Sequence, residues 1–145
     1  MKIIFKSENH RQRFLVAIQQ TGKIYEGHIN EEYGAALYIL TSNSGTWERA
    51  KSYVGRDGIK FDELIANEHW SGGYLALIQL AGNLFNAGYT QASPVDFVTS
   101  LDEQNFQVAM TALQIRRRSW HLGNFLTDDE NVQKVNEILN SQEDE

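Results

Sequence analysis

Apolar side chains recur every three or four residues along most of this chain, and that spacing places them on one face of an α-helix. The stretch 7–22 carries His10, Phe14, Ala17 and Ile18 on one such face and ends at a glycine. The stretch 31–42 follows Asn30, a favoured helix N-cap, and is apolar around most of its circumference. We therefore expect an amphipathic first helix and a central, buried second one.

Further helices are expected along the rest of the chain. Two short ones flank a Gly-Arg-Asp-Gly turn at 55–58, and the strongest pattern runs over 71–88. Gly88 is the expected end of that helix, and a close helix crossing is the expected reason for Gly82 inside it. Extended segments are expected only at 2–5, as a strand or a plug in the core, and at 22–29, as a loop or short strand.

The last third of the chain contains three helix-start signals. They are Ser93 before Pro94, a capping box formed by Ser100 and Glu103, and a second box formed by Thr127 and Glu130. The helix after Ser100 is expected to bury Phe106, Ala109, Met110 and Leu113. The sequence thus predicts an all-α fold, a compact multi-helix single domain over 1–145 with a short N-terminal extended segment and a C-terminal helical arm.

Composition narrows the class of protein. The net charge of −6 argues against generic affinity for a phosphate backbone, so we expect no nucleic-acid partner. The chain has no cysteine, and no apolar run approaches the length of a membrane span. We therefore expect a soluble, cytoplasmic protein without disulfides or thiolate metal sites.

Motifs for catalysis are lacking in the sequence. The four histidines are dispersed, and none forms the i, i+4 pair of a helical metal site. The acid pairs Glu31–Glu32 and Asp128–Asp129 lie where helix capping already explains them. We predict no catalytic residues, no metal ligands and no cofactor.

Two stretches remain as candidate binding sites. His69, Trp70, Ser71 and Gly72 combine an imidazole, an indole and a helix start, which suits a small ligand, although capping alone also explains Ser71.

The second stretch is Arg116, Arg117 and Arg118 followed by Trp120. Cations in a last helical turn compensate the helix dipole, whereas arginine with tryptophan also suits a protein interface or base stacking. If a protein partner exists, Trp47, Arg117 and Trp120 are the expected anchors, together with Trp70.

Three segments, "GAALYILTSNSGTWERAKSYV", "LALIQLAGNLFNAG" and "SLDEQNFQVAMTALQIRR", resemble in order and spacing a family of small uncharacterised helical proteins from Gram-positive bacteria and their phages. The resemblance covers about residues 7–118 and implies a compact helical domain of phage or mobile-element origin. Residues 119–145 look like a C-terminal extension to that family. The family carries no established activity, so the resemblance implies no catalytic residue.

The leading functional hypothesis is a non-enzymatic protein that binds and inhibits or modulates a host protein, such as a defence component, in the manner of an anti-CRISPR protein. A second hypothesis is a small-ligand or nucleotide-binding domain or enzyme that uses His69, Trp70 and Ser71. A third, a structural or assembly protein, predicts a homodimer or larger homo-oligomer.

Overall fold

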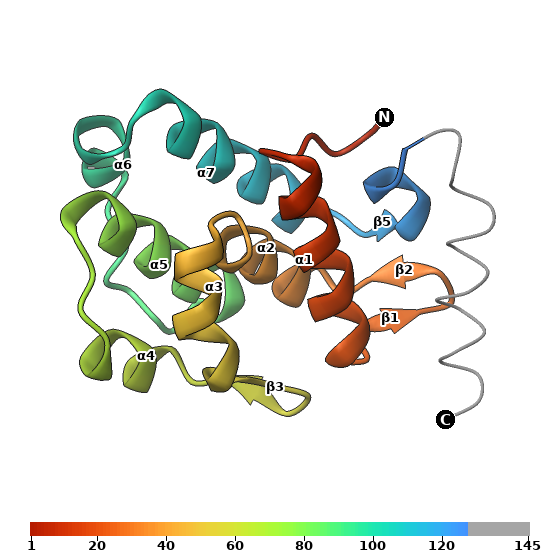
Figure 1. The fold of residues 1–145 in the computed structure, drawn as a ribbon, viewed down its shortest axis with the longest axis horizontal. Helices are drawn as coiled ribbons and strands as arrows, with labels where there is room; N and C mark the ends of the chain where they lie inside the picture. The colour runs from red at the N-terminus through yellow and green to blue at the C-terminus, as the bar shows by residue number, and fades with distance from the viewer. Residues whose placement is uncertain (128–145) are drawn as a thin grey trace.

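The computed structural model describes residues 1–127, and within them the chain forms one compact, mostly helical domain (Figure 1). Its elements are α1 (Glu8–Gln20), β1 (Ile24–Tyr25), β2 (His28–Ile29), α2 (Glu31–Leu40), α3 (Ser44–Ala50), the 3₁₀ helix η1 (Lys51–Tyr53), β3 (Val54–Gly55), β4 (Gly58–Ile59), α4 (Phe61–Asn67), α5 (Gly72–Phe85), α6 (Pro94–Ser100), α7 (Glu103–Arg116), β5 (Trp120–His121) and the 3₁₀ helix η2 (Leu122–Phe125). The all-α prediction is confirmed, with small strands added.

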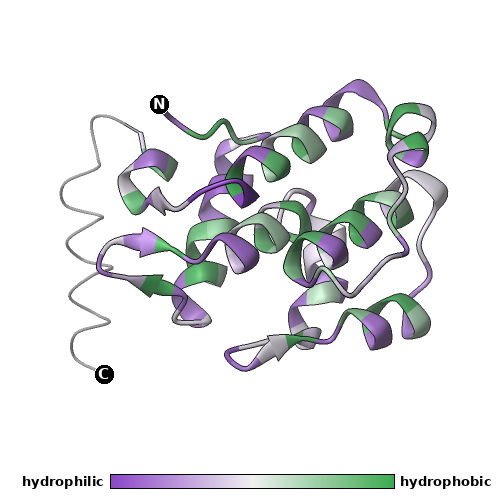
Figure 2. Ribbon diagram, turned by 180° about the vertical axis from the view of Figure 1, so that it is seen from behind, coloured by the Kyte–Doolittle hydropathy of each residue, from purple (hydrophilic) through white to green (hydrophobic). Residues whose placement is uncertain are grey.

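Helix α2 is the centre of the domain, as its all-round apolar pattern predicts. Every residue from Tyr33 to Leu40 is buried, and α1, α5 and α7 pack around it (Figures 1 and 2). The Asn30 side chain caps its start by accepting a hydrogen bond from the Tyr33 amide at 2.9 Å. A helix that is apolar on all faces is stable in water only inside such a cluster.

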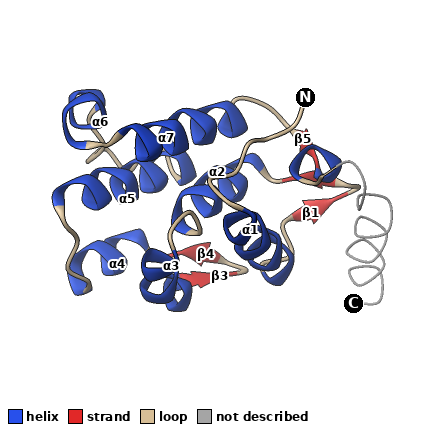
Figure 3. Cartoon of the chain, turned by 45° about the horizontal axis from the view of Figure 1, so that its top comes forward, coloured by secondary structure: helices blue, strands red, loops and turns tan. Residues whose placement is uncertain are grey.

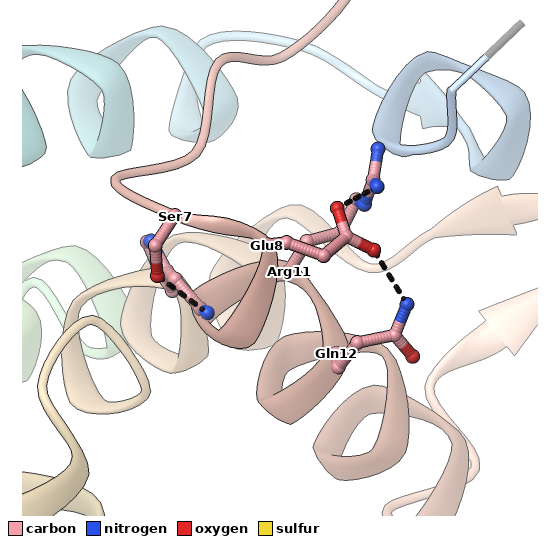
Figure 4. Close-up of polar contacts among 5 residues, drawn as sticks. Ser7, Glu8, Arg11 and Gln12 are labelled. Carbon is pink, nitrogen blue, oxygen red and sulfur yellow. Dashed lines mark hydrogen bonds and ion pairs between the residues drawn. The ribbon is translucent and has the colours of Figure 1, made fainter.

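Helix α1 covers one side of α2 and buries the predicted face of His10, Phe14, Ala17 and Ile18. The Ser7 hydroxyl accepts from the His10 amide at 3.0 Å and fixes the start of the helix. On the exposed side, the Glu8 carboxylate accepts hydrogen bonds from Arg11 and Gln12, one turn further along (Figure 4). Such contacts between residues three and four apart add a little helix stability.

Two small sheets, one of three short strands and one of two, lie at separate places on the helical body (Figure 3). Strands β1 and β2 form a hairpin whose turn holds Glu26 and Gly27 at positive φ. Strand β5 adds antiparallel to β2, with Ile29 opposite Trp120. Strands β3 and β4 form the second hairpin at the predicted turn between α3 and α4.

Residues 119–127, the described part of the predicted C-terminal extension, pack as part of the domain. Trp120, Leu122, Phe125 and Leu126 are all buried, and the Ile3 amide donates to the Asn124 carbonyl at 2.7 Å. Ile3 is buried without forming a strand, so the N-terminal segment is a plug in the core. The expected helix from Thr127 onward, with its acids Asp128 to Glu130, lies outside the described residues apart from Thr127 itself.

Helix α5 ends at Phe85, three residues before the predicted glycine end. A Cβ at Gly82 would come 2.9 Å from the Tyr89 ring, which folds back from the loop after α5. The glycine therefore makes room for this ring, and the expected helix crossing is not the reason for it. The Phe61 ring of α4 lies next to the same position, at 3.4 Å.

Helix α7 differs from its prediction in both its cap and its buried face. Asp102 is the N-cap and accepts from the Asn105 amide at 2.8 Å, so the Ser100–Glu103 capping box does not form. The face toward the core carries Val108, Ala109, Ala112 and Ile115. Of the four residues predicted to be buried, only Ala109 is, because the face that carries Phe106, Met110 and Leu113 lies at the edge of the core, beside α6.

Candidate functional site

The predicted ligand site at the start of α5 is held in place by its neighbours. Trp70 is only 8% exposed, and its indole N–H donates to the Leu64 carbonyl at 3.4 Å. The Arg49 guanidinium lies over the Trp70 ring at 4.9 Å and donates to the His69 carbonyl at 2.6 Å. The indole thus serves packing between α3 and α4, and its ring face is already occupied by a cation.

The amino end of α5 faces another backbone group. Ser71 is the N-cap residue, but its hydroxyl makes no capping hydrogen bond, and a Cβ at Gly73 would meet the Ser100 carbonyl oxygen at 3.0 Å. Ser100 is the last residue of α6, so a carbonyl with partial negative charge lies against the positive end of α5. This arrangement weakens the attraction for an anion that Ser71 and Gly72 suggest in the sequence.

The three consecutive arginines have three different environments. Arg116 donates from Nε to the Leu84 carbonyl at 2.9 Å and so ties the end of α7 to α5. Arg118 lies over the Trp120 ring at 3.8 Å, and both Arg117 and Arg118 are exposed. The run is therefore partly structural, and Arg117 and Arg118 are its members at the surface.

The tryptophans proposed as anchors are mostly covered. Trp120 is 4% exposed and donates its indole N–H to the Gln114 carbonyl at 3.1 Å, so the expected base stacking or interface contact by this ring has no free face. Trp47 is half-buried against the core. A buried indole needs a hydrogen-bond partner, and here backbone carbonyls provide it.

Of the four histidines, His69 is an exposed residue before Trp70, and the other three occur in two settings. His28 and His121 face each other across β2 and β5 with ring centroids 5.5 Å apart. The Nδ1 atom of His121 accepts from the Gly123 amide at 3.0 Å, which engages one of its two ring nitrogens. Within residues 1–127, no three side chains of the metal-binding types come together as a metal site.

His10 lies in the core beside Phe5, Phe14 and Tyr38. Its Nε2–H donates to the Tyr38 carbonyl at 2.7 Å, while Nδ1 accepts from the Lys6 amide at 3.1 Å. Burial lowers the pKa of His10 to about 4, and the charges of Arg13 and Lys6 act in the same direction. The neutral ring joins the N-terminal segment to α2.

An aromatic hollow between α4 and α5 has no counterpart among the predicted sites. Its volume is about 280 Å³, and the half-buried rings of Phe85 and Tyr89 line it together with Phe61, which is only 6% exposed, with Asp62 and Glu63 at its edge beside Lys60. The Phe61 ring lies 5.8 Å from Phe85 and 6.4 Å from Tyr89, centroid to centroid. Burial raises the pKa of Tyr89, and the Asp62 carboxylate raises it further. Aromatic faces beside carboxylates suit a guanidinium or ammonium group.

An apolar groove of about 340 Å³ runs between α5, α6 and α7. Phe97 and Val98 form its wall on α6, and Phe106, Met110 and Leu113 form its wall on α7. Val98 is 69% exposed and Leu113 is 36% exposed. Apolar side chains gathered in this way on a surface mark an interaction site more often than isolated ones do.

Except for Ile59 and Lys60 of the hollow, the residues that line the two surfaces belong to one stretch of the chain without positive side chains. Residues 61–115, from the first residue of α4 to the residue before the last of α7, contain six acidic residues and no lysine or arginine. Residues 1–60 contain nine basic and six acidic residues. The uneven distribution was readable in the sequence, but only the fold shows that α4, α5, α6 and α7 pack as neighbours.

Comparisons with known proteins add no relative. No family model matches the chain, and neither the curated proteins nor the solved structures contain a significant match. The resemblance to the small phage-associated family therefore stays a prediction. In the described part of the chain, every helix is too short or too polar to cross a bilayer.

Proposed function

We propose that this chain is a non-enzymatic binding protein that acts by direct contact with a basic surface of a host protein. The observation that carries the proposal is the aromatic hollow of Phe61, Phe85 and Tyr89 with Asp62 and Glu63 at its edge. An arginine or lysine side chain of a partner would place its charge near the carboxylates and its stem against the Phe85 and Tyr89 rings.

Charge on the wider surface supports a partner of this kind. Glu68 and Asp96 also lie in the stretch 61–115, which contains no lysine or arginine, although Lys60 lines the hollow itself beside Asp62 and Glu63. Complementary charge speeds encounter and disfavours wrong partners, while a filled pocket slows dissociation. The hollow would bind one basic side chain of the partner, and the acidic residues of the stretch would attract the basic surface around it.

The biological setting of the proposal rests on the sequence resemblance. If the chain derives from a phage or a mobile element, a host defence component is the partner class that an inhibitor of this size would occupy. The acidic surface suits the basic grooves with which such components hold nucleic acid.

The test is affinity capture from host lysate with a tagged chain and two double variants. In D62K/E63K the charge beside the hollow is reversed, and both residues are exposed in the first turn of α4. The matched control is E31K/E32K, which makes the same charge change in the first turn of α2. Thermal unfolding of each variant measures the loss of helix-dipole stabilisation common to both.

We expect the wild type and the E31K/E32K variant to capture the same protein. Recovery with D62K/E63K should fall at least about tenfold, because a pair of like charges would face the partner. Equal recovery with both variants, or no protein captured by the wild type, would contradict the proposal.

The start of α5 supports no second function. Trp70 is buried under Arg49, and the Ser100 carbonyl lies against the first turn of the helix. No observation in the described residues favours a nucleotide or other small anion there.

A further inference from the structure

Helix α7 carries, along the side next to α6, a stripe whose two ends have opposite charges and whose apolar middle is half-buried at Phe106 and Met110. Glu103, Met110 and Arg117 are spaced by seven residues, and Phe106 and Leu113 lie between them on the same side of the helix. The stripe is about 21 Å long, from 14 residues at 1.5 Å each. Its order is acid, apolar, apolar, apolar, base.

This order is symmetric about Met110. If a second α7 lies antiparallel against the first, Glu103 faces Arg117 of the second copy and Met110 faces its own equivalent. Phe106 then faces Leu113 of the second copy, and the exchange occurs twice because a two-fold axis repeats each contact.

We propose that two copies of this chain associate through α7, in an antiparallel, two-fold arrangement centred on Met110. The groove beside the stripe provides the depth that such packing needs, because Val98 and Phe97 of α6 extend the apolar wall beyond α7. Leu113 of each copy enters the groove of the other, next to Phe106. The inference does not depend on the proposed function, since the aromatic hollow lies at α4 and stays open in the dimer.

Charge at the ends of the stripe favours a second copy over another occupant. A basic helix from a different protein would be attracted at Glu103 and repelled at Arg117. Arg117 and Glu103 are both exposed, and Glu103 accepts one hydrogen bond from Gln107 at 3.0 Å through Oε1. Arg116, by contrast, is already engaged by the Leu84 carbonyl.

A cysteine at the axis tests the arrangement directly, because the chain contains no cysteine of its own. Two Met110→Cys side chains would face each other across two helices packed 8–10 Å apart, so mild oxidation at low protein concentration should yield a disulfide-linked dimer. Gln104→Cys, which is exposed on the other side of α7, is the matched control and should stay largely monomeric. Equal cross-linking of the two variants overturns the proposal.

Charge exchange tests the register. The mean molar mass of the wild type in light scattering should rise from 16.6 kDa toward twice that value with concentration. E103R and R117E should each weaken the dimer at least about tenfold, and the double variant E103R/R117E should restore it to within about threefold. E63R, an acid-to-arginine change in the first turn of α4, should leave the dimer unchanged. A wild type that stays monomeric at all concentrations, or a double variant that does not recover, overturns the proposal.

Discussion

At the residue scale, His10 shows how a titratable group becomes a core residue. Both ring nitrogens are engaged by backbone groups, one from the N-terminal segment and one from α2. The ring also lies edge-on to Phe5 at a centroid distance of 4.9 Å. Protonation would give Nδ1 a hydrogen where it now accepts one, and would leave a charge in an apolar surrounding.

The free energy of unfolding is expected to fall as the pH drops from 6.5 to about 4. Over this range the unfolded chain binds a proton at His10, whereas the folded chain does not, because its pKa is lowered to about 4. The full contribution is about 3 kcal/mol. Urea unfolding across this pH range measures it.

The variant H10Q keeps an N–H donor for the Tyr38 carbonyl but cannot titrate, so its stability should change less with pH than that of the wild type. H28Q removes an exposed histidine and is the control that should keep the wild-type slope. A wild-type slope in H10Q would mean that other groups cause the acid sensitivity.

The cost of a side chain at position 82 is expected to come mainly from one neighbouring ring, that of Tyr89. In the variant G82A the new methyl group would meet the Tyr89 ring at 2.9 Å, so the free energy of unfolding should fall by about 1–2 kcal/mol. In a Y89A background the ring is absent, and the same change should raise it by up to about 1 kcal/mol through helix propensity. A double-mutant cycle by urea unfolding compares the effect of G82A on the free energy of unfolding in the two backgrounds. Equal effects in both would show that the Tyr89 ring does not contact this position.

At the element scale, helix α7 begins two residues later than the sequence pattern suggests. Asp102 and Ser100 are both acceptable caps by residue type, and only the chain path selects between them. Ser100 instead ends α6, where its carbonyl lies against α5. Helices α6 and α7 follow each other directly, so a local capping motif cannot predict at which residue α6 ends and α7 begins.

Asp102 is expected to contribute to stability and the Ser100 side chain is not. D102A should lower the free energy of unfolding by about 1 kcal/mol, because the Asn105 amide loses its acceptor. S100A should change it by less than about 0.5 kcal/mol. Denaturant unfolding of the two variants compares them, and the reverse order would place the cap at Ser100.

The sequence predicted α1, α2 and α5 because periodicity and caps are local signals. It could not predict that β5 pairs with β2, since Trp120 and Ile29 are separated by most of the chain. It also selected Trp70 and Trp120 as binding residues by type, whereas backbone carbonyls at 64 and 114 hold both indoles inside. The hollow around Phe61 and Tyr89 forms only because the loop after α5 folds back onto α4 and α5. No local sequence pattern predicts that path of the chain.

At the scale of the whole molecule, charge is distributed by element. The stretch 61–115 contains six acidic residues, toward its two ends, and no lysine or arginine, and the three arginines at 116–118 follow it directly. The net charge of the whole chain disfavours binding to nucleic acid. The fold places the acidic residues of α4 beside an aromatic hollow. The acidic residues of α4 beside the hollow therefore suit a basic surface of a partner protein. The stripe on α7 suits a second copy of this chain.

Hydrogen exchange on the complex with a captured host protein tests the central claim most directly, because it reports which backbone amides the partner covers. The account predicts added protection at 61–68 and 86–91, on the elements around the hollow, with little change at 24–29 in the first hairpin. Protection confined to the hairpin and η2, with α4 unchanged, would contradict it.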